Sequence, residues 1–195
     1  MKINLKIAIA LFSIIITSSC SHKVTRVSQD TVIDLSGRWN DTDSQETSTA
    51  MISQSLGDNW LLNFEQKYPG KKPVIIVGFI QNNTDEHIQS ETFIRDLEKA
   101  FINSGRVRLV SGGDKRDQIR KERAQQQDYS TEASMKKWGQ EIGADYMLQG
   151  DISSIIDSYK KEKVIFYQVN LQMTDIETTE VVWLGDKKIK KYIKG

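Results

Sequence analysis

One continuous apolar run, residues 74–80, constrains the fold of this chain more than any other feature. The run follows Pro73, and Gly78 is its only residue without an apolar side chain. Apolar runs of this length are typical of a central strand that is buried on both faces. The turn-forming residues 82–85 predict where this strand ends.

A helix and a second strand are predicted immediately after this turn. Apolar residues recur there at helical spacing, and Gly105 offers a C-cap. Residues 107–110 alternate and predict a second strand. The order strand, helix, strand indicates an α/β layer. The apolar positions of the helix are Phe93, Ile94, Leu97, Ala100 and Phe101.

The C-terminal third of the chain alternates with period two and predicts three strands in an antiparallel meander. A turn-rich stretch, residues 175–179, separates the last two of these strands. With the strand–helix–strand unit, this pattern predicts an α/β fold, a single domain whose mixed β-sheet is flanked by helices. The alternating residues are Tyr146, Leu148 and Ile152, then Ile165, Tyr167, Val169, Leu171 and Met173, and finally Val181 and Trp183.

Residues 41–43 offer N-cap candidates for a helix that runs towards Leu56. A calcium loop would also use the alternating Asp41 and Asp43. Such a loop needs a glycine where Glu46 stands, so we favour the capping interpretation.

Two more elements are expected on weaker patterns. Residues 32–35 predict a short strand. A helix is expected to begin at residue 130 or 131, because Met135, Trp138 and Ile142 would then share one side.

Two runs of basic residues are candidates for binding a partner. Residues 115–123 form helices readily but have almost no apolar face, so this segment is either a solvated flank or a contact surface for an acidic partner. The lysines of residues 187–191 either blunt an exposed sheet edge or form a basic patch. On charge alone, the candidate partner-binding residues are Lys115, Arg116, Arg120, Arg123, Lys187, Lys188, Lys190 and Lys191.

The N-terminus has the features of a secretory signal. Lys2 and Lys6 precede an apolar stretch, residues 7–16, that is half the length of a membrane span. Small residues then lead to Cys20, the single cysteine of the chain. A stray free cysteine is the alternative, but its place at the end of the apolar stretch favours lipid attachment.

This pattern divides the chain into three parts. Residues 1–19 are expected to be a lipoprotein signal peptide, and residues 20–31 a lipidated cysteine with a short flexible tether. Fully extended, the tether reaches only about 35–40 Å. Residues 32–195 are expected to form the folded domain.

Composition and motifs argue against several functions. Lys plus Arg number 27 and Asp plus Glu 26, so the net charge of +1 gives no reason to expect a nucleic-acid partner. One cysteine and two histidines are too few for a structural zinc site. His87 is expected to start a helix rather than to act as a base. Asp145, Asp151 and Asp157 would serve a glycosidase only if two of them met across a cleft. We expect no enzyme and no cofactor.

Three stretches, residues 35–44, 74–110 and 141–150, resemble the LpoB family of penicillin-binding protein activators. The Gly-Ala-Asp-Tyr sequence at residues 143–146 and the hairpin at 175–183 are also similar to the wider group that includes the N-terminal domain of TolB and the secretion lipoprotein CsgG. The resemblance covers about residues 32–193.

This resemblance implies a TolB-like α/β domain with a binding role. The implied protein is a monomeric outer-membrane lipoprotein, anchored through Cys20, that binds a class A penicillin-binding protein and activates peptidoglycan synthesis. Ser21, after the cysteine, favours outer-membrane residence in such lipoproteins. The alternative is a non-enzymatic structural lipoprotein of an envelope assembly or secretion apparatus. The best-known LpoB proteins have a long proline-rich linker, whereas here Pro69 and Pro73 are the only prolines.

Overall fold

The computed structural model describes residues 24–28, 31–129 and 141–195. Residues 32–195 form one compact unit, and the first 31 residues are a separate one. In the first unit, residues 24–28 have no regular secondary structure and are exposed. The predicted signal peptide, Cys20 and most of the helix expected after residue 130 lie outside the described residues.

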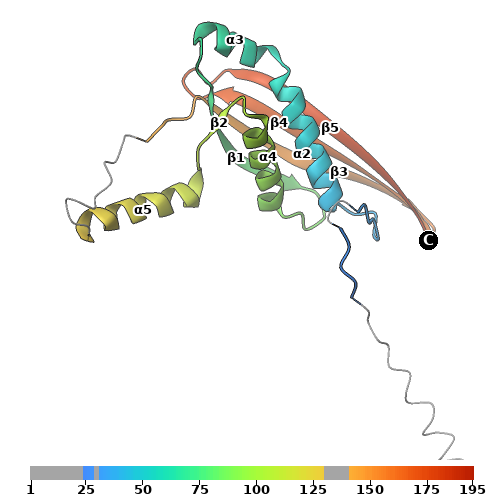
Figure 1. Cartoon of the computed structure of the whole chain (residues 1–195). Helices are drawn as coiled ribbons and strands as arrows, with labels where there is room; N and C mark the ends of the chain where they lie inside the picture. Colours follow the sequence, from blue (N-terminus) through green and yellow to red (C-terminus); the bar gives the residue numbers. More distant parts are fainter. Residues whose placement is uncertain (1–23, 29–30, 130–140) are drawn as a thin grey trace, which may run out of the picture. The chain divides into compact units, whose positions relative to one another are not determined.

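The sheet of the described chain has five strands, in the order β2-β1-β3-β4-β5 (Figure 1). Strand β1 pairs in parallel with β2 and β3, whereas β4 pairs antiparallel with both β3 and β5. This confirms the predicted mixed sheet and its antiparallel meander. The strands are β1 (Val74–Asn83), β2 (Arg108–Leu109), β3 (Tyr146–Tyr159), β4 (Glu162–Asp175) and β5 (Val181–Lys194).

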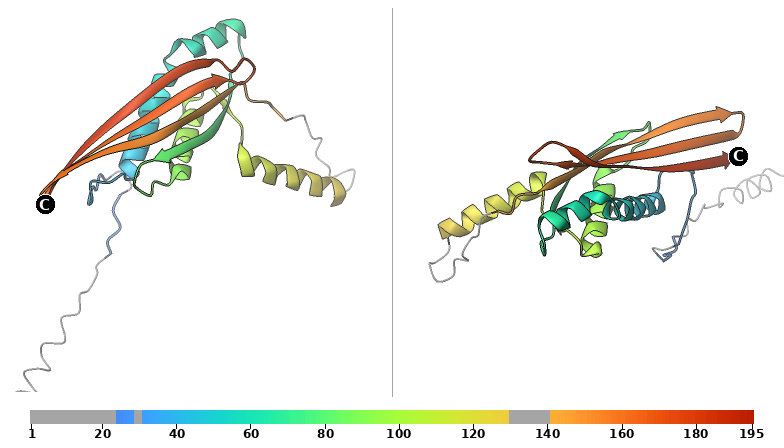
Figure 2. Two further views of the ribbon diagram at one scale, coloured as in Figure 1. Left: turned by 180° about the vertical axis from the view of Figure 1, so that it is seen from behind. Right: turned by 90° about the horizontal axis from the view of Figure 1, so that it is seen from above.

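Helices α2, α3 and α4 lie on one side of the sheet (Figure 2). The predicted helix after β1 is confirmed as α4, and Gly105 caps it with a positive φ of 64°. The charged stretch is confirmed as helix α5. The helices are α2 (Asp41–Leu56), α3 (Asn59–Lys67), α4 (Ser90–Ser104) and α5 (Gly113–Tyr129). None of the described helices combines the length and apolarity needed to cross a bilayer.

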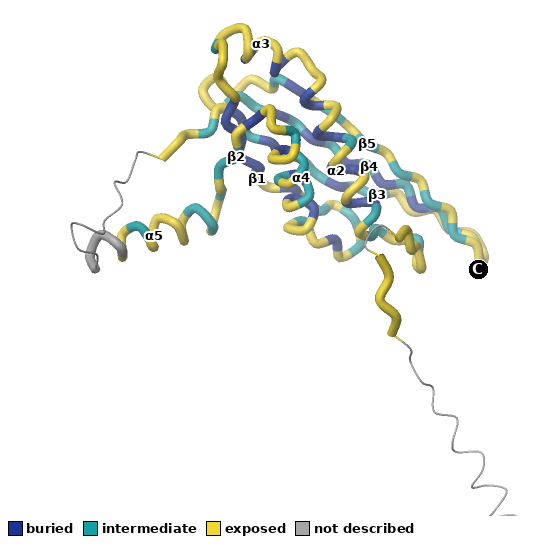
Figure 3. The backbone as a smooth tube through the Cα atoms, in the orientation of Figure 1, coloured by how far each residue is buried: buried dark blue, intermediate teal, exposed yellow. Residues whose placement is uncertain are grey.

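The core lies between these helices and the sheet, where buried residues face one another (Figure 3). Phe93, Leu97 and Phe101 of α4 are fully buried against it. In β4, every second residue from Ile165 to Met173 is buried, as the alternation predicts. The opposite faces of β3, β4 and β5 therefore carry the alternate, more exposed side chains.

Helix α2 begins at a capping box. The Asn40 side chain accepts from the Asp43 backbone N–H at 3.1 Å, and the Asp43 carboxylate accepts from the Asn40 N–H at 3.0 Å. The N-cap residue is therefore Asn40 and not one of the predicted residues 41–43, which lie inside the helix, and Asp43 completes the capping box from the N3 position.

Three expected elements need correction. Residues 32–35 are not a strand: they are exposed and irregular, because they have no strand to pair with. The second strand is shorter than predicted, with only Arg108 and Leu109 in the ladder. Ile142 lies in an irregular segment before β3 and is largely exposed, so it does not belong to a helix.

Candidate protein-binding surfaces

The described residues do not place a metal-binding cluster. No group of three or more His, Cys, Asp or Glu side chains is placed there to hold a metal ion. His87 is exposed before α4. Asp145, Asp151 and Asp157 follow one another at six-residue intervals, which in a strand means about 20 Å per interval. This spacing excludes the paired carboxylates of a glycosidase, which lie about 5–10 Å apart.

Two of these aspartates have structural contacts instead. A carboxylate oxygen of Asp145 accepts from the Val74 backbone N–H at 2.7 Å and so joins the start of β3 to the start of β1. Asp151 accepts from the Asn170 side chain at 3.3 Å. Sequence reasoning could not distinguish these contacts from catalytic pairing.

Lys191, one of the predicted basic residues, is largely buried. Its side chain is only 11% exposed, and its ammonium group lies 2.8 Å from Asp34 and 2.6 Å from Asp43. It also donates to the Arg38 carbonyl at 2.9 Å. Lys191 therefore fastens the segment before α2 to the edge strand β5.

The protonation of this cluster follows from its geometry. Burial disfavours the charged form of Lys191, but hydrogen bonds to Asp34 and Asp43 outweigh that effect and raise its pKa. The hydrogen bond from Lys191 is also the main cause of a lowered pKa at Asp34. Both groups are therefore charged around neutral pH.

The other predicted lysines of β5 differ in position. Lys188 and Lys190 are exposed on the face of the sheet that α2 and α4 leave uncovered, whereas Lys187 is half-buried on the opposite face. Lys188 lies 3.2 Å from Asp186 on its own strand. The strand register places Lys190 opposite Phe166, which in turn pairs with Ile155.

Apolar side chains surround Lys190 near the β3–β4 turn. Ile155 is 69% exposed and Tyr192 is 60% exposed, although both are large apolar residues in regular strands. They share the uncovered face with Phe166 and Val164. We call Ile155, Val164, Phe166, Lys190 and Tyr192 the hairpin-end surface. Contiguous exposed apolar groups beside a cation are typical of a protein interface.

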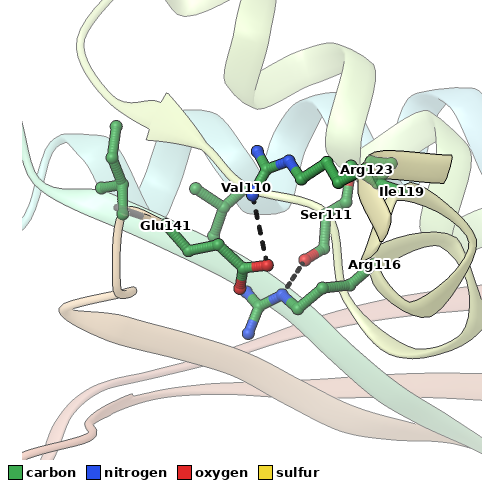
Figure 4. Close-up of a pocket in the computed structure, with 7 residues that line it drawn as sticks. Val110, Ser111, Arg116, Ile119, Arg123 and Glu141 are labelled. Atoms are coloured by element: carbon green, nitrogen blue, oxygen red, sulfur yellow. Dashed lines mark hydrogen bonds and ion pairs between the residues drawn. The ribbon is translucent and has the colours of Figure 1, made fainter. Parts of the chain in front are cut away.

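The basic residues of α5 are largely engaged within the chain. The Arg120 guanidinium donates to both carboxylate oxygens of Glu141, at 3.0 and 2.9 Å. Arg123 lies 3.4 Å from the same carboxylate. Arg116 donates to the Ser111 carbonyl at 2.8 Å (Figure 4). This arginine cluster was identified from charge, but sequence gave no sign that Glu141 would face it.

The electrostatics of the cluster are consistent with this pairing. The hydrogen bond from Arg120 is the main cause of a lowered pKa at Glu141. The same bond raises the pKa of Arg120. Lys115, at the start of the helix, instead lies 3.5 Å from Glu98 of α4. Arg120 and Arg123 thus share the Glu141 carboxylate.

Comparison with solved structures finds similar chains of low identity. The LpoB C-terminal domain from Salmonella enterica has 17% identity and a TM-score of 0.43, with 75% of this chain and 98% of that chain covered. The LpoB C-terminal domain from Escherichia coli has 20% identity and a TM-score of 0.42, with 78% and 99% covered. Lipoprotein GNA1162 from Neisseria meningitidis has 14% identity and a TM-score of 0.39, with 62% and 83% covered.

The sequence itself carries the family assignment. A search of curated proteins finds no match. The family model described as peptidoglycan-synthase activator LpoB matches residues 43–189, which is well over half of the chain and extends from α2 into β5. The chain therefore belongs to the LpoB family of peptidoglycan-synthase activators.

Proposed function

We propose that this protein is an outer-membrane lipoprotein that binds a class A penicillin-binding protein and activates its peptidoglycan synthesis. The observation that carries the proposal is the LpoB family match over residues 43–189, which includes most of the compact unit. The protein acts by binding rather than by catalysis.

The anchor in this proposal is Cys20. After removal of residues 1–19, acyl chains on the cysteine hold the protein on the bilayer, each buried methylene contributing about 0.8 kcal/mol. Ser21 favours transfer to the outer membrane. The segment from Cys20 to residue 31 then connects the lipid to the domain.

Activation in this proposal is allosteric. The lipoprotein binds one synthase domain and favours the more active conformation of the enzyme. It can shift that equilibrium only by the difference between its affinities for the two conformations. No cofactor takes part.

The hairpin-end surface is the best candidate for the synthase contact. It combines the exposed Ile155 and Tyr192 with Lys190, which has no carboxylate within ion-pair distance in the described structure. Lys188 lies next to it on the same face. Aromatic and aliphatic side chains that are buried on binding provide most of the affinity of such interfaces.

Direct binding tests this proposal. We would immobilise each class A penicillin-binding protein of the same organism and measure its affinity for the full chain in detergent. The double variant Ile155→Ser/Lys190→Glu should weaken binding at least tenfold. Lys99→Glu, at an exposed lysine of α4 on the other side of the sheet, should leave it unchanged.

The outcomes test the hairpin-end surface and the proposed function separately. Equal loss with both variants would exclude the hairpin-end surface as the specific contact. A wild-type chain that binds none of these synthases would contradict the proposed function.

A further inference from the structure

The edge strand β2, on the other side of the sheet from β5, offers a second surface for an interaction. Strand β2 is the edge strand there, and its outer side has no strand partner in the described structure. Arg108 and Val110 donate their backbone N–H groups to Pro73 and Ile75 of the β1 side, at 2.8 and 3.0 Å. Backbone groups alternate in direction along a strand, so the Leu109 N–H points away from β1. An extended peptide can pair with such an edge.

Two hollows adjoin this edge and share Ile142. One, of about 250 Å³, is lined by Val110, Ile119 and Arg116 among others, and is the hollow of Figure 4. The other, of about 610 Å³, is lined by Phe64, Val74 and Arg108 among others. We call the two together the β2 groove. The apolar part of its floor includes Phe64, Val74 and Ile142, and each hollow also contains basic side chains.

The end near α3 carries three cations. Lys71, Lys72 and Arg108 line it, and no described carboxylate lies within ion-pair distance of them. Lys71 is held 5.8 Å from the centre of the Tyr68 ring, which limits the freedom of its ammonium group. Asp145, the one acid in this lining, already accepts a hydrogen bond from the Val74 N–H.

The end near α5 already binds a carboxylate. Arg120 holds Glu141 through two hydrogen bonds of 2.9 and 3.0 Å, and Arg123 approaches the same group. Paired donation of this kind is the geometry by which arginine recognises carboxylates. The cluster therefore shows which chemical group this end of the groove accepts.

We propose that the β2 groove binds an acidic peptide segment of a partner protein, in extended conformation, with carboxylates at both ends and apolar side chains between them. Glu141 occupies the α5 end until a carboxylate of the partner replaces it. The site is distinct from the hairpin-end surface, because nine residues of β3, or about 30 Å, separate Tyr146 from Ile155. The protein can thus hold two partners at once.

A peptide fits the groove better than a free polyanion does. Phosphates and polyphosphates would satisfy the cations but not the apolar floor formed by Phe64, Val74 and Ile142. They would also leave the outward N–H of Leu109 without a strand partner. A short extended segment satisfies all three features.

The test uses the full chain in detergent and a fluorescein-labelled peptide, Glu-Glu-Val-Leu-Val-Glu-Glu, followed by fluorescence anisotropy. The triple variant Lys71→Glu/Lys72→Glu/Arg108→Glu should raise the Kd at least tenfold. Glu141→Gln should lower the Kd several-fold, because it removes the internal competitor. The triple variant Lys99→Glu/Lys160→Glu/Lys161→Glu changes the net charge by the same amount at exposed lysines of α4 and the β3–β4 turn, and it should leave the Kd within twofold.

Other ligands complete the test. The peptide with glutamine in place of every glutamate should bind at least tenfold more weakly, and tripolyphosphate should not displace the peptide at equal concentration. The proposal is overturned if the groove variant binds as well as wild type, or if the control triple variant weakens binding equally. It is also overturned if Glu141→Gln fails to tighten binding, or if tripolyphosphate competes as well as the peptide.

Discussion

Gly37 lies at a position where the structure leaves no room for a side chain. Its φ is 67°, in the left-handed region, and an added Cβ would overlap the Ile193 side chain of β5. We predict that Gly37→Ala lowers the free energy of unfolding by about 1–3 kcal/mol, measured by urea denaturation.

Gly70 provides the matched control. Its φ is 75°, but nothing lies within 4 Å of an added Cβ. Gly70→Ala should therefore lower the free energy of unfolding only through the strain of its left-handed backbone conformation. This loss should be smaller than that caused by Gly37→Ala. Equal losses in the two variants would show that the contact with Ile193 has no role.

Lys191 should contribute stability that depends on pH. Replacing Lys191 with methionine leaves Asp43 without its cation. We predict that the free energy of unfolding at pH 7 then falls by about 1–3 kcal/mol, which lies between the contributions of exposed and buried ion pairs. Lys190→Met, at the adjacent position, which is exposed, should change the free energy of unfolding little.

The pH profile of this loss follows from the two pKa shifts. Because the pKa of Lys191 is raised, its contribution is complete below the unfolded value of about 10.4 and is lost as pH rises through the folded value. Because the pKa of Asp34 is lowered, its contribution is complete above about pH 3.9 and is lost as pH falls through the folded value. A difference from wild type that is constant from pH 3 to pH 11 would contradict the assignment.

For single residues, the sequence predicts burial correctly where apolar residues repeat at a regular spacing. Tyr167 and Val169 were assigned to the core because they alternate, and both are fully buried. Lys191 has the same spacing, but lysine suggests solvent, and its two partners lie about 150 residues away in the chain. Pairing over such distances leaves no local signal.

At the scale of elements, the start of α2 depends on its capping box. Asn40→Ala removes the acceptor for the Asp43 N–H, and we predict a loss of about 1 kcal/mol in unfolding free energy, measured by thermal and urea denaturation. Asn103→Ala, at an exposed position inside α4, removes no cap and should cause no loss. A comparable loss from Asn103→Ala would contradict the capping account.

Long elements with a clear period were predictable, and short ones were not. The alternation of β4 and the helical spacing of α4 identified both elements. Residues 32–35 have strand-forming side chains but no strand to pair with, so the residue types alone predicted a strand that is not there. Strand β5 extends to Lys194, well beyond its apolar start, because pairing with β4 holds its lysine-rich half in the sheet.

At the scale of the whole molecule, the lipid anchor should determine where the protein resides. We predict that the mature protein begins at Cys20 and carries acyl chains, which intact-mass analysis of the membrane-extracted protein would show. Cys20→Ser should leave the protein unacylated and move it from the membrane fraction to the soluble fraction. An unmodified Cys20 in the membrane-bound wild type would contradict the anchor.

The two ends of the sheet have different surfaces, and sequence located only part of each. The basic runs were visible as charge, but the exposed Ile155 and the carboxylate of Glu141 became relevant only through the fold. Register places Ile155 in a row with Phe166 and Lys190. Glu141, in the irregular segment before β3, faces the arginines of α5. Such juxtapositions depend on topology rather than on local pattern.

The most direct test of the central claim is the rate of glycan-strand polymerisation by the class A penicillin-binding proteins of the same organism, with increasing amounts of this protein. We predict a rate that rises and saturates for at least one synthase. The Ile155→Ser/Lys190→Glu variant should require a higher concentration for the same increase, whereas Lys99→Glu should behave as wild type. An unchanged rate with every such synthase, at concentrations that saturate binding, would contradict activation.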